Sequence, residues 1–241
     1  MKKLNRLYVN SELIPGNQYT LDSNASNYLI KVLRHTSGEK IHCFNGIGKE
    51  AICTISSTNN KATLVQINEI ISQSIQTPPK LHLAIGLLKG QAMDRAIQHA
   101  TELGATDIWL LQSERSNTHY NDKRLATKTE HWRKVTISSA QQCGETFLPR
   151  IHGPNHISTV FEQTKTAERM IFDPKGVPLE KNLVLKERIL FIGPEGGWSR
   201  EEESYFKIQK ASLYSLGKRI LRAENSPSVA LALVNHGQNQ A

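Results

Sequence analysis

The sequence has little of what a secreted or membrane protein needs. Its three cysteines, Cys43, Cys53 and Cys143, form no C-x-x-C pair, and an odd number gives no disulfide framework. No apolar run approaches the length of a membrane span, and the first residues, Met-Lys-Lys-Leu-Asn-Arg, contain no apolar core of a signal peptide. These absences favour a cytoplasmic protein in a reducing compartment, without a membrane partner.

Several catalytic signatures are also missing. The nine histidines form no cluster with the spacing of metal ligands, so no metal site is predicted. There is no Gly-x-Ser-x-Gly nucleophile elbow, no P-loop and no G-x-G-x-x-G fingerprint. The sequence therefore argues against a metalloenzyme, a serine hydrolase of the usual kind and a dinucleotide-binding dehydrogenase.

The charge balance is basic. The 241 residues, enough for two modest domains or one large one, include 30 Lys and Arg against 22 Asp and Glu, a net charge of +8. A basic excess of this size indicates a polyanionic partner such as nucleic acid, although a soluble protein that happens to be basic is the alternative.

The first 75 residues predict a small β domain. Short apolar strands alternate with turn signals such as Asn45-Gly46, a pattern typical of a barrel. A short helix is expected over residues 27–35, with Lys31 and Arg34 on one face. Residues 76–80 contain two adjacent prolines and are predicted to be a linker, so that residues 81–241 form a second domain.

Strands alternate with helices after the linker. This pattern predicts an α/β domain with a largely parallel sheet and helices on both faces. We expect strands at 81–88, 108–111, 149–151, 170–172, 189–192 and 213–216, and helices at 93–103, 125–143 and 157–163, with further helices beginning at Ser199 and Ser226.

The stretch from Arg188 to Glu202 is the most informative in the chain. Its apolar run predicts a buried strand, and Gly193–Gly197 then supplies three glycines and a proline for a tight loop. Ser199 and Glu202 have the spacing of a capping box at a helix start. Strand, glycine loop and helix start together are the usual site of ligand capture in α/β folds, with a purely structural turn as the alternative. Glycine-bearing strand ends at 173–176 and from Gly217 onwards are expected to converge on the same ligand.

Two motifs carry a resemblance to a known family. Ile192–Gly197 (Ile-Gly-Pro-Glu-Gly-Gly) and Leu216–Glu224 (Leu-Gly-Lys-Arg-Ile-Leu-Arg-Ala-Glu) resemble the RsmE family of SPOUT-class methyltransferases, which act on N3 of a uridine in the 16S RNA of the small ribosomal subunit. Further matching segments follow the family order over nearly the whole chain: 5–8, 31–34, 102–104, 113–116 and 142–144.

The resemblance implies a fold, a cofactor and partners. It implies an N-terminal PUA-like RNA-binding barrel over residues 1–75 and a C-terminal SPOUT domain whose parallel sheet contains a trefoil knot. It implies a homodimer with residues 226–236 near the interface, and 16S rRNA or the small subunit as the partner. It implies no metal, but S-adenosyl-L-methionine as cofactor, held by Phe172, Ile192, Gly193, Pro194, Glu195, Gly196, Gly197, Leu216, Gly217, Ile220 and Leu221.

Basic residues that match the family pattern are expected to contact RNA phosphates, because a polyanion needs distributed positive charge. They are Arg6, Lys31, Arg34 and Arg115.

The expected chemistry assigns roles to Arg222 and Glu224. Uridine N3 normally carries a proton, so the enzyme must stabilise negative charge as that proton leaves. Arg222 has a permanent charge and a planar donor fork suited to a carbonyl oxygen. Glu224 is expected to accept the proton, directly or through water, or to orient Arg222. An Arg–Glu pair that only pins the loop is the structural alternative.

Two departures from the family pattern support rival hypotheses. Glu145 stands where the family usually has Arg, and Ala223 and Asn225 replace the two threonines of Thr-Glu-Thr. These changes suggest, as one alternative, a non-catalytic RNA-binding protein of the same fold. A second alternative is a nucleotide-binding enzyme that uses the glycine loop for phosphate, which the charge of Glu195 disfavours.

Overall fold

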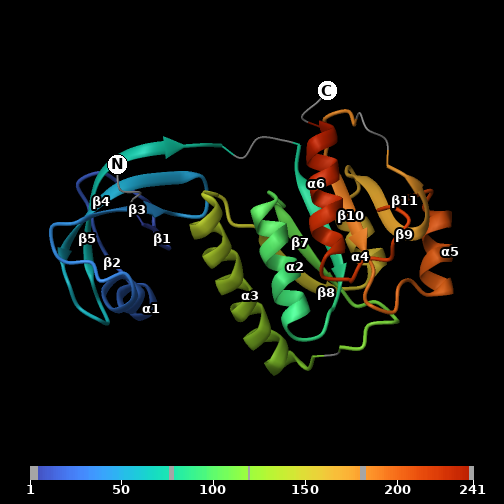
Figure 1. Ribbon diagram of the computed structural model, residues 1–241, viewed down its shortest axis with the longest axis horizontal. Helices are drawn as coiled ribbons and strands as arrows, with labels where there is room; N and C mark the ends of the chain where they lie inside the picture. Colours follow the sequence, from blue (N-terminus) through green and yellow to red (C-terminus); the bar gives the residue numbers. More distant parts are fainter. Residues whose placement is uncertain (1–4, 76–78, 119, 180–182, 239–241) are drawn as a thin grey trace. The chain divides into compact units, whose positions relative to one another are not determined.

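The computed structural model describes residues 5–75, 79–118, 120–179 and 183–238 (Figure 1). They form two compact units, the first made of Met1–Gln76 and Ala140–Leu148, the second of Thr77–Ser139 and Pro149–Ala241. The change of units after Gln76 falls in the predicted linker, of which residues 76–78 lie outside the described residues. The sequence did not indicate that residues 140–148 join the first unit.

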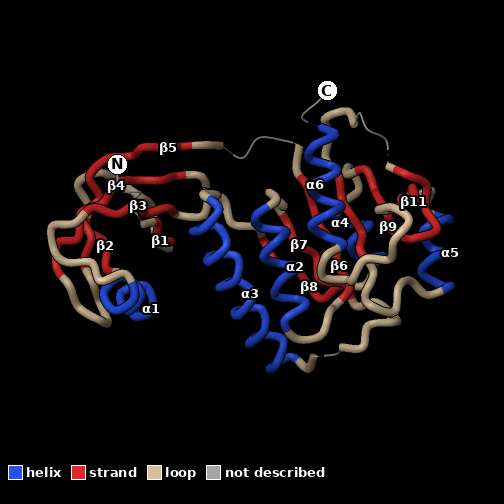
Figure 2. Tube along the Cα trace, in the orientation of Figure 1, coloured by secondary structure: helices blue, strands red, loops and turns tan. Residues whose placement is uncertain are grey.

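The first unit is built on a five-stranded sheet of order β1-β3-β4-β5-β2 (Figure 2). In it β1 pairs with β3 in parallel and the other pairs are antiparallel. Alternate residues face a single apolar core, as the buried Ala51, Cys53 and Ile55 of one strand illustrate. Its strands are β1 (Arg6–Tyr8), β2 (Gln18–Thr20), β3 (Lys40–Phe44), β4 (Lys49–Ser57) and β5 (Leu64–Gln73). Strand β2 was not predicted because its three residues are mostly exposed and carry no apolar alternation.

The helix of this unit differs from the prediction. Helix α1 (Ser23–Asn27), capped by the side chain of Asp22, continues into the π-helical segment η1 (Tyr28–Val32). The Leu33 amide then donates to the carbonyl of Tyr28 and the chain turns into the left-handed region at Arg34, with φ of +58°. The expectation that Lys31 and Arg34 share a helix face is therefore wrong, since the helix ends before Arg34.

Residues 140–148 are bound to the sheet of the first unit by backbone and side-chain hydrogen bonds. The amide of Leu148 donates to the carbonyl of Gly46 at 2.9 Å. The guanidinium of Arg6 donates to the carbonyls of Ala140 and Glu145 at 2.7 and 3.1 Å. These bonds join segments far apart in sequence, which is why local patterns did not reveal them.

The second unit has the predicted α/β architecture. Its six-stranded sheet has the order β11-β9-β10-β6-β7-β8, and every pairing is parallel. The strands are β6 (Leu81–Gly86), β7 (Asp107–Leu111), β8 (Arg150–Asn155), β9 (Glu168–Pro178), β10 (Arg188–Ile192) and β11 (Ser212–Ser215). The helices are α2 (Gln91–Glu102), α3 (Asp122–Cys143), α4 (Ile157–Gln163), α5 (Arg200–Ile208) and α6 (Ser226–Gln238).

Helices cover both faces of this sheet (Figure 1). Leu190 packs in a core with residues of α2, α6 and Trp132 of α3, while its neighbour Phe191 packs in a second core with residues of α4 and α5. Both faces of β10 are thus buried, as its unbroken apolar run predicted. Strand β9 is longer than predicted: its pairing with β10 ends at Phe172, but it pairs with β11 again at Val177.

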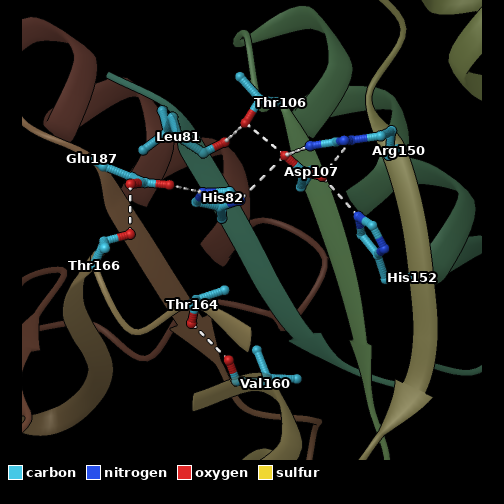
Figure 3. Close-up of polar contacts among 10 residues, drawn as sticks. All are labelled: Leu81, His82, Thr106, Asp107, Arg150, His152, Val160, Thr164, Thr166 and Glu187. Carbon is cyan, nitrogen blue, oxygen red and sulfur yellow. Dashed lines mark hydrogen bonds and ion pairs between the residues drawn. The ribbon is translucent and has the colours of Figure 1, made fainter. Parts of the chain in front are cut away.

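A charged network lies at the amino ends of the strands (Figure 3). Asp107, with a side chain only 2% exposed, accepts two hydrogen bonds from Arg150 at 2.8 and 3.1 Å. The same carboxylate lies 2.7 Å from Nε2 of His152 and 3.3 Å from Nδ1 of His82. Nε2 of His82 lies 2.9 Å from the carboxylate of Glu187. Burial alone would raise the pKa of Asp107, but the contacts with His152, His82 and Arg150 hold it well below its usual range.

Replacing Asp107 with Asn is expected to destabilise the second unit by about 1–3 kcal/mol, because the buried carboxylate and its buried partner His82 lose a charged contact, whereas Arg150 is mostly exposed. A depressed carboxyl pKa contributes stability that is full above the unfolded value of about 3.9 and is lost as the pH falls below it. Wild-type stability should therefore fall as the pH drops below about 4, and less steeply in Asp107→Asn. Urea unfolding followed by tryptophan fluorescence tests this, because Trp109, Trp132 and Trp198 all lie in the second unit.

The control is Glu162→Gln, which breaks an ion pair to Lys165 whose two side chains are each 70% exposed. Its cost should stay below about 1 kcal/mol. Equal stability of Asp107→Asn and wild type at pH 7 would contradict the role of the network.

Candidate functional site

Loops at the carboxyl ends of β9, β10 and β11 surround one cavity of about 300 Å³. These strands are neighbours in the sheet, in the order β11-β9-β10, so parallel pairing brings their following loops to the same edge. The cavity is lined by Phe172, Asp173, Pro174, Ile192, Gly193, Pro194, Glu195, Gly196, Gly197, Trp198, Ser215, Leu216, Gly217, Arg219, Ile220, Leu221, Ala223 and Ser226.

Every residue predicted to hold the cofactor lines this cavity. The structure thus brings the glycine loop and the segment from Leu216 to Leu221 together, as the sequence predicted. The lining residues that the sequence did not assign individually to the cofactor are Asp173, Pro174, Trp198, Ser215, Arg219, Ala223 and Ser226. All seven lie within or next to segments that the sequence predicted to bind the ligand. The glycine-bearing strand end at 173–176 had already indicated Asp173 and Pro174.

Close packing explains the glycine loop and its surroundings. A Cβ on Gly86, the last residue of β6, would lie 2.6 Å from the backbone nitrogen of Pro194. Gly197 has a φ of +67° and donates its amide to the carbonyl of Pro194 at 2.9 Å, which closes the turn. The indole of Trp198 donates to the carbonyl of Phe172 at 3.2 Å and ties this loop to β9.

The predicted capping box is confirmed at the start of α5. The amide of Glu202 donates to the hydroxyl of Ser199 at 3.1 Å, and the Ser199 amide donates to the Glu202 carboxylate at 2.8 Å. These bonds fix where the helix begins, and so fix the end of the glycine loop that precedes it.

The third loop turns directly into α6. The carbonyl of Arg222 accepts hydrogen bonds from the amides of Asn225 and Ser226 at 2.9 and 3.2 Å. Gly217 has a φ of +118°, a conformation that favours glycine. Ile220 lines the cavity and yet is 85% exposed, so this loop forms the open side of the site.

The two predicted catalytic residues lie beside the cavity rather than in its lining. Leu221, Ala223 and Ser226 line it, whereas Arg222 and Glu224 do not. Arg222 is exposed and Glu224 is half-buried. Within the described part of the chain, no side-chain hydrogen bond or ion pair joins the two. An ion pair that pins the loop is therefore not present, and the catalytic assignment stays a prediction.

The residues predicted to contact RNA have different surroundings. Arg6 has a side chain only 8% exposed, because its donors bind Glu50 at 2.7 Å and two backbone carbonyls. Lys31 and Arg34 are exposed in the first unit. Arg115 is exposed in the second unit and donates from Nη1 to the carbonyl of Gly196 at 3.2 Å. Arg115 thus contacts the cavity wall, whereas Arg6 is already bound within its own unit.

The reversed charge at Glu145 has a local structural use. Its carboxylate accepts hydrogen bonds from the amides of Thr146 and Phe147 at 2.7 and 2.9 Å. The carboxylate therefore stabilises the turn over residues 145–147, a use that an arginine side chain could not replace because it has no acceptor.

Neither a metal centre nor a membrane-crossing element is found in the described residues. No group of three or more His, Cys, Asp or Glu side chains there is arranged to hold a metal ion. No helix in the same residues has both the length and the apolar character needed to cross a bilayer.

Comparison with known families gives two matches. The RNA methyltransferase domain matches residues 76–235, and the PUA domain of RNA methyltransferases matches residues 21–68. The first match includes every residue that lines the cavity, and the second lies within the first unit.

Similar proteins agree along nearly the whole chain. The chain is 30% identical to the ribosomal RNA small subunit methyltransferase E of Buchnera aphidicola subsp. Acyrthosiphon pisum over 237 residues, 95% of this chain and 92% of that protein. It is 31% identical to the protein of the same name from Synechocystis, over 95% and 77% of the two chains.

Solved structures share the fold. A methyltransferase of Legionella pneumophila with bound cofactor SAM has a TM-score of 0.91 at 28% identity, over 98% of both chains. The ribosomal RNA small subunit methyltransferase E of Neisseria gonorrhoeae bound to S-adenosyl methionine has a TM-score of 0.88 at 26% identity, also over 98% of both chains.

Replacing Gly86 with Ala is expected to displace Pro194 and to weaken binding of S-adenosylmethionine by roughly tenfold or more, because overpacking typically costs about 1–3 kcal/mol. Isothermal calorimetry measures the affinity. The control is Gly104→Ala, whose φ of +76° makes alanine strained but whose Cβ would meet nothing within 4 Å. That variant should lose stability and keep its affinity. Unchanged affinity in Gly86→Ala would show that this loop does not shape the binding site.

Proposed function

Because the chain belongs to the RNA methyltransferase family that matches residues 76–235, we propose that it methylates N3 of one uridine in the 16S RNA of the small ribosomal subunit, with S-adenosylmethionine as methyl donor. The observation that carries the proposal is the meeting of three strand-end loops around one cavity of about 300 Å³. Its similarity to small subunit methyltransferases supports the choice of RNA.

The cavity fits this cofactor in size and in charge. Its volume of about 300 Å³ is at the lower end of the range for small-molecule sites. Two carboxylates, Asp173 and Glu195, line it, and Arg219 is the one cation among its lining residues. Carboxylates suit a sulfonium and an ammonium group, whereas they would repel the phosphates of a nucleotide. The nucleotide-binding alternative is therefore disfavoured, and a purely RNA-binding protein would have no use for the cavity.

The protein's own part in the reaction is positioning and charge. When bound, the cofactor supplies an electrophilic methyl group. The target base must be unpaired or extruded, since N3 lies on its Watson–Crick edge. Arg222 then stabilises the negative charge that reaches the uracil oxygens as N3 loses its proton, and Glu224 accepts that proton or orients Arg222. Both follow lining residues of the third loop, which supports their reaching a base at the open side of the cavity.

RNA binding and assembly complete the proposal. Of the four predicted basic residues, the exposed Lys31, Arg34 and Arg115 contact phosphates, in keeping with the net charge of +8. The Arg6 side chain is buried and its donors already bind within its own unit, so its contribution to RNA binding is to hold residues 140–148 in place. The chain forms a homodimer with α6 near the interface, contains a trefoil knot in the second unit, and works in the cytoplasm, where ribosomes are assembled. These features rest on the family resemblance.

Incubation with labelled S-adenosylmethionine and unmodified small subunits, followed by mapping of the modified base, tests the proposal. Label is expected on N3 of a single uridine. Free 16S rRNA in a parallel reaction shows which form is the substrate. Absence of transfer to either form, or label on a different base, would overturn the proposed function.

In the same assay Arg222→Ala should lose about 100-fold in rate, because removing one oriented charge from a transition state typically has that cost. Its cofactor affinity should change little, since Arg222 does not line the cavity. The control is Lys218→Ala, which removes an exposed cation from the same loop. A near wild-type rate in Arg222→Ala would refute the assignment of Arg222.

Glu224→Gln should shift the pH–rate profile if Glu224 is the base, but only lower the amplitude of that profile if Glu224 orients Arg222.

A further inference from the structure

The first turn of α5 holds the loop that follows β7. The Glu202 side chain belongs to a residue only 8% exposed. Its Oε2 serves the capping box, but its Oε1 accepts from the hydroxyl of Ser113 at 2.8 Å and from the amide of Glu114 at 3.1 Å. A capping box does not need these two bonds. They join the β7 loop to the helix that follows the glycine loop, across a buried and charge-assisted contact.

This grip fixes Arg115 against the cavity wall. A Cβ on Gly196 would lie 2.9 Å from Cβ of Arg115 and 3.0 Å from its carbonyl oxygen, so the two loops touch where only glycine fits. The guanidinium of Arg115 also donates to the carbonyl of Gly196 at 3.2 Å. Arg115 is therefore held from two sides, by the loop bound to Glu202 and by its own bond to the lining residue Gly196.

Arg115 keeps its charge available. Its cationic neighbour Lys175 is paired with Glu203 at 2.6 Å. In the described part of the chain, by contrast, no carboxylate lies within 4.0 Å of the Arg115 guanidinium. The residue is exposed, and its one hydrogen bond leaves further donors of the planar fork free. A guanidinium that is oriented beside the cavity and forms no direct ion pair with the described residues is suited to a phosphate group.

We propose that Glu202 is a positioning residue: it holds Arg115 at the edge of the cavity, where Arg115 binds a phosphate next to the base that is methylated. This rests on the proposed function, because it takes RNA as the ligand. Glu202 itself is buried and does not touch the RNA. Its effect passes through Ser113, Glu114 and Arg115.

For the change in RNA affinity on replacing Glu202, the proposal predicts the opposite direction from simple electrostatics. Removing a carboxylate lowers the repulsion of a polyanion, so Glu→Gln ordinarily leaves RNA binding unchanged or strengthens it. Glu201 provides the matched control: it is exposed on the same turn and makes no side-chain hydrogen bond or ion pair in the described residues. Glu201→Gln and Glu202→Gln remove the same charge, but only the second changes the buried contact. A glutamine side chain has a single acceptor oxygen, so it cannot accept both from Ser199 and from the β7 loop as the two oxygens of Glu202 do.

The experiment measures binding of unmodified 16S rRNA at several salt concentrations. Arg115→Ala and Glu202→Gln should each weaken binding by about three- to tenfold and lower the slope of log K against log salt by about one, the loss expected for one phosphate contact. The double variant should bind no more weakly than either single variant, because both remove the same contact. Ser113→Ala, which removes one of the two bonds to Oε1, should show part of the effect. Calorimetry with S-adenosylmethionine checks that each variant keeps its cavity.

Two results would overturn the proposal. The first is equal RNA affinity of Glu202→Gln and Glu201→Gln. The second is a loss of affinity in the Arg115→Ala, Glu202→Gln double variant that equals the product of the two single losses. If Glu202→Gln fails to fold, Ser113→Ala with wild-type RNA affinity and salt slope refutes the proposal by itself. Amide hydrogen exchange distinguishes failure of this positioning proposal from failure of the proposed function. The Glu114 amide should exchange faster in Glu202→Gln than in Glu201→Gln even if the wild type binds no rRNA, and equal rates would refute the grip.

Discussion

The parallel pairing of β11, β9 and β10 is the constraint on which the site depends. Parallel strands end at the same edge, and these three are adjacent, so the loops that follow them must meet. The register that holds them is long range: Phe172 pairs with Ile192, and Val177 pairs with Tyr214. Glycines at 86, 193 and 196 then allow backbones to approach where a side chain would collide or crowd its neighbours. The cavity follows from this arrangement before any catalytic residue is considered.

The two ends of the same sheet have different tasks. At the amino ends, the buried carboxylate of Asp107 contacts His82, His152 and Arg150 from neighbouring strands. At the carboxyl ends, glycine loops leave a cavity that carries few paired charges. The contacts that stabilise the sheet and the loops that line the cavity therefore lie at opposite ends of the same strands. A substitution in a cavity loop need not disturb the ionic contacts of Asp107.

The sequence was most informative where structure is local. The capping box of Ser199 and Glu202 and the buried strand β10 were predicted, because a few neighbouring residues decide them. The cavity lining was predicted from glycine-bearing strand ends and a family resemblance. The left-handed turn at Arg34 was not predicted, although it is local, because a positive φ is uncommon for any residue other than glycine and an arginine gives no signal for it.

Long-range contacts could not be read from local patterns. The binding of residues 140–148 to the first unit depends on Arg6 and Gly46, more than ninety positions away in the sequence. The second role of Glu202 was also missed, since its bond to Ser113 joins residues 89 positions apart. In both cases the residue types can be read from the sequence, but it does not show which distant residues they contact.

The central claim is that the loops after β9, β10 and β11 form the S-adenosylmethionine site. Amide hydrogen exchange with and without this cofactor tests it most directly, because it locates binding without requiring RNA or turnover. The account predicts slower exchange in residues 193–198 and 215–223 when the cofactor is present, with residues 5–75 unchanged. Slower exchange confined to other segments, or none at a cofactor concentration that calorimetry shows to be saturating, would contradict it.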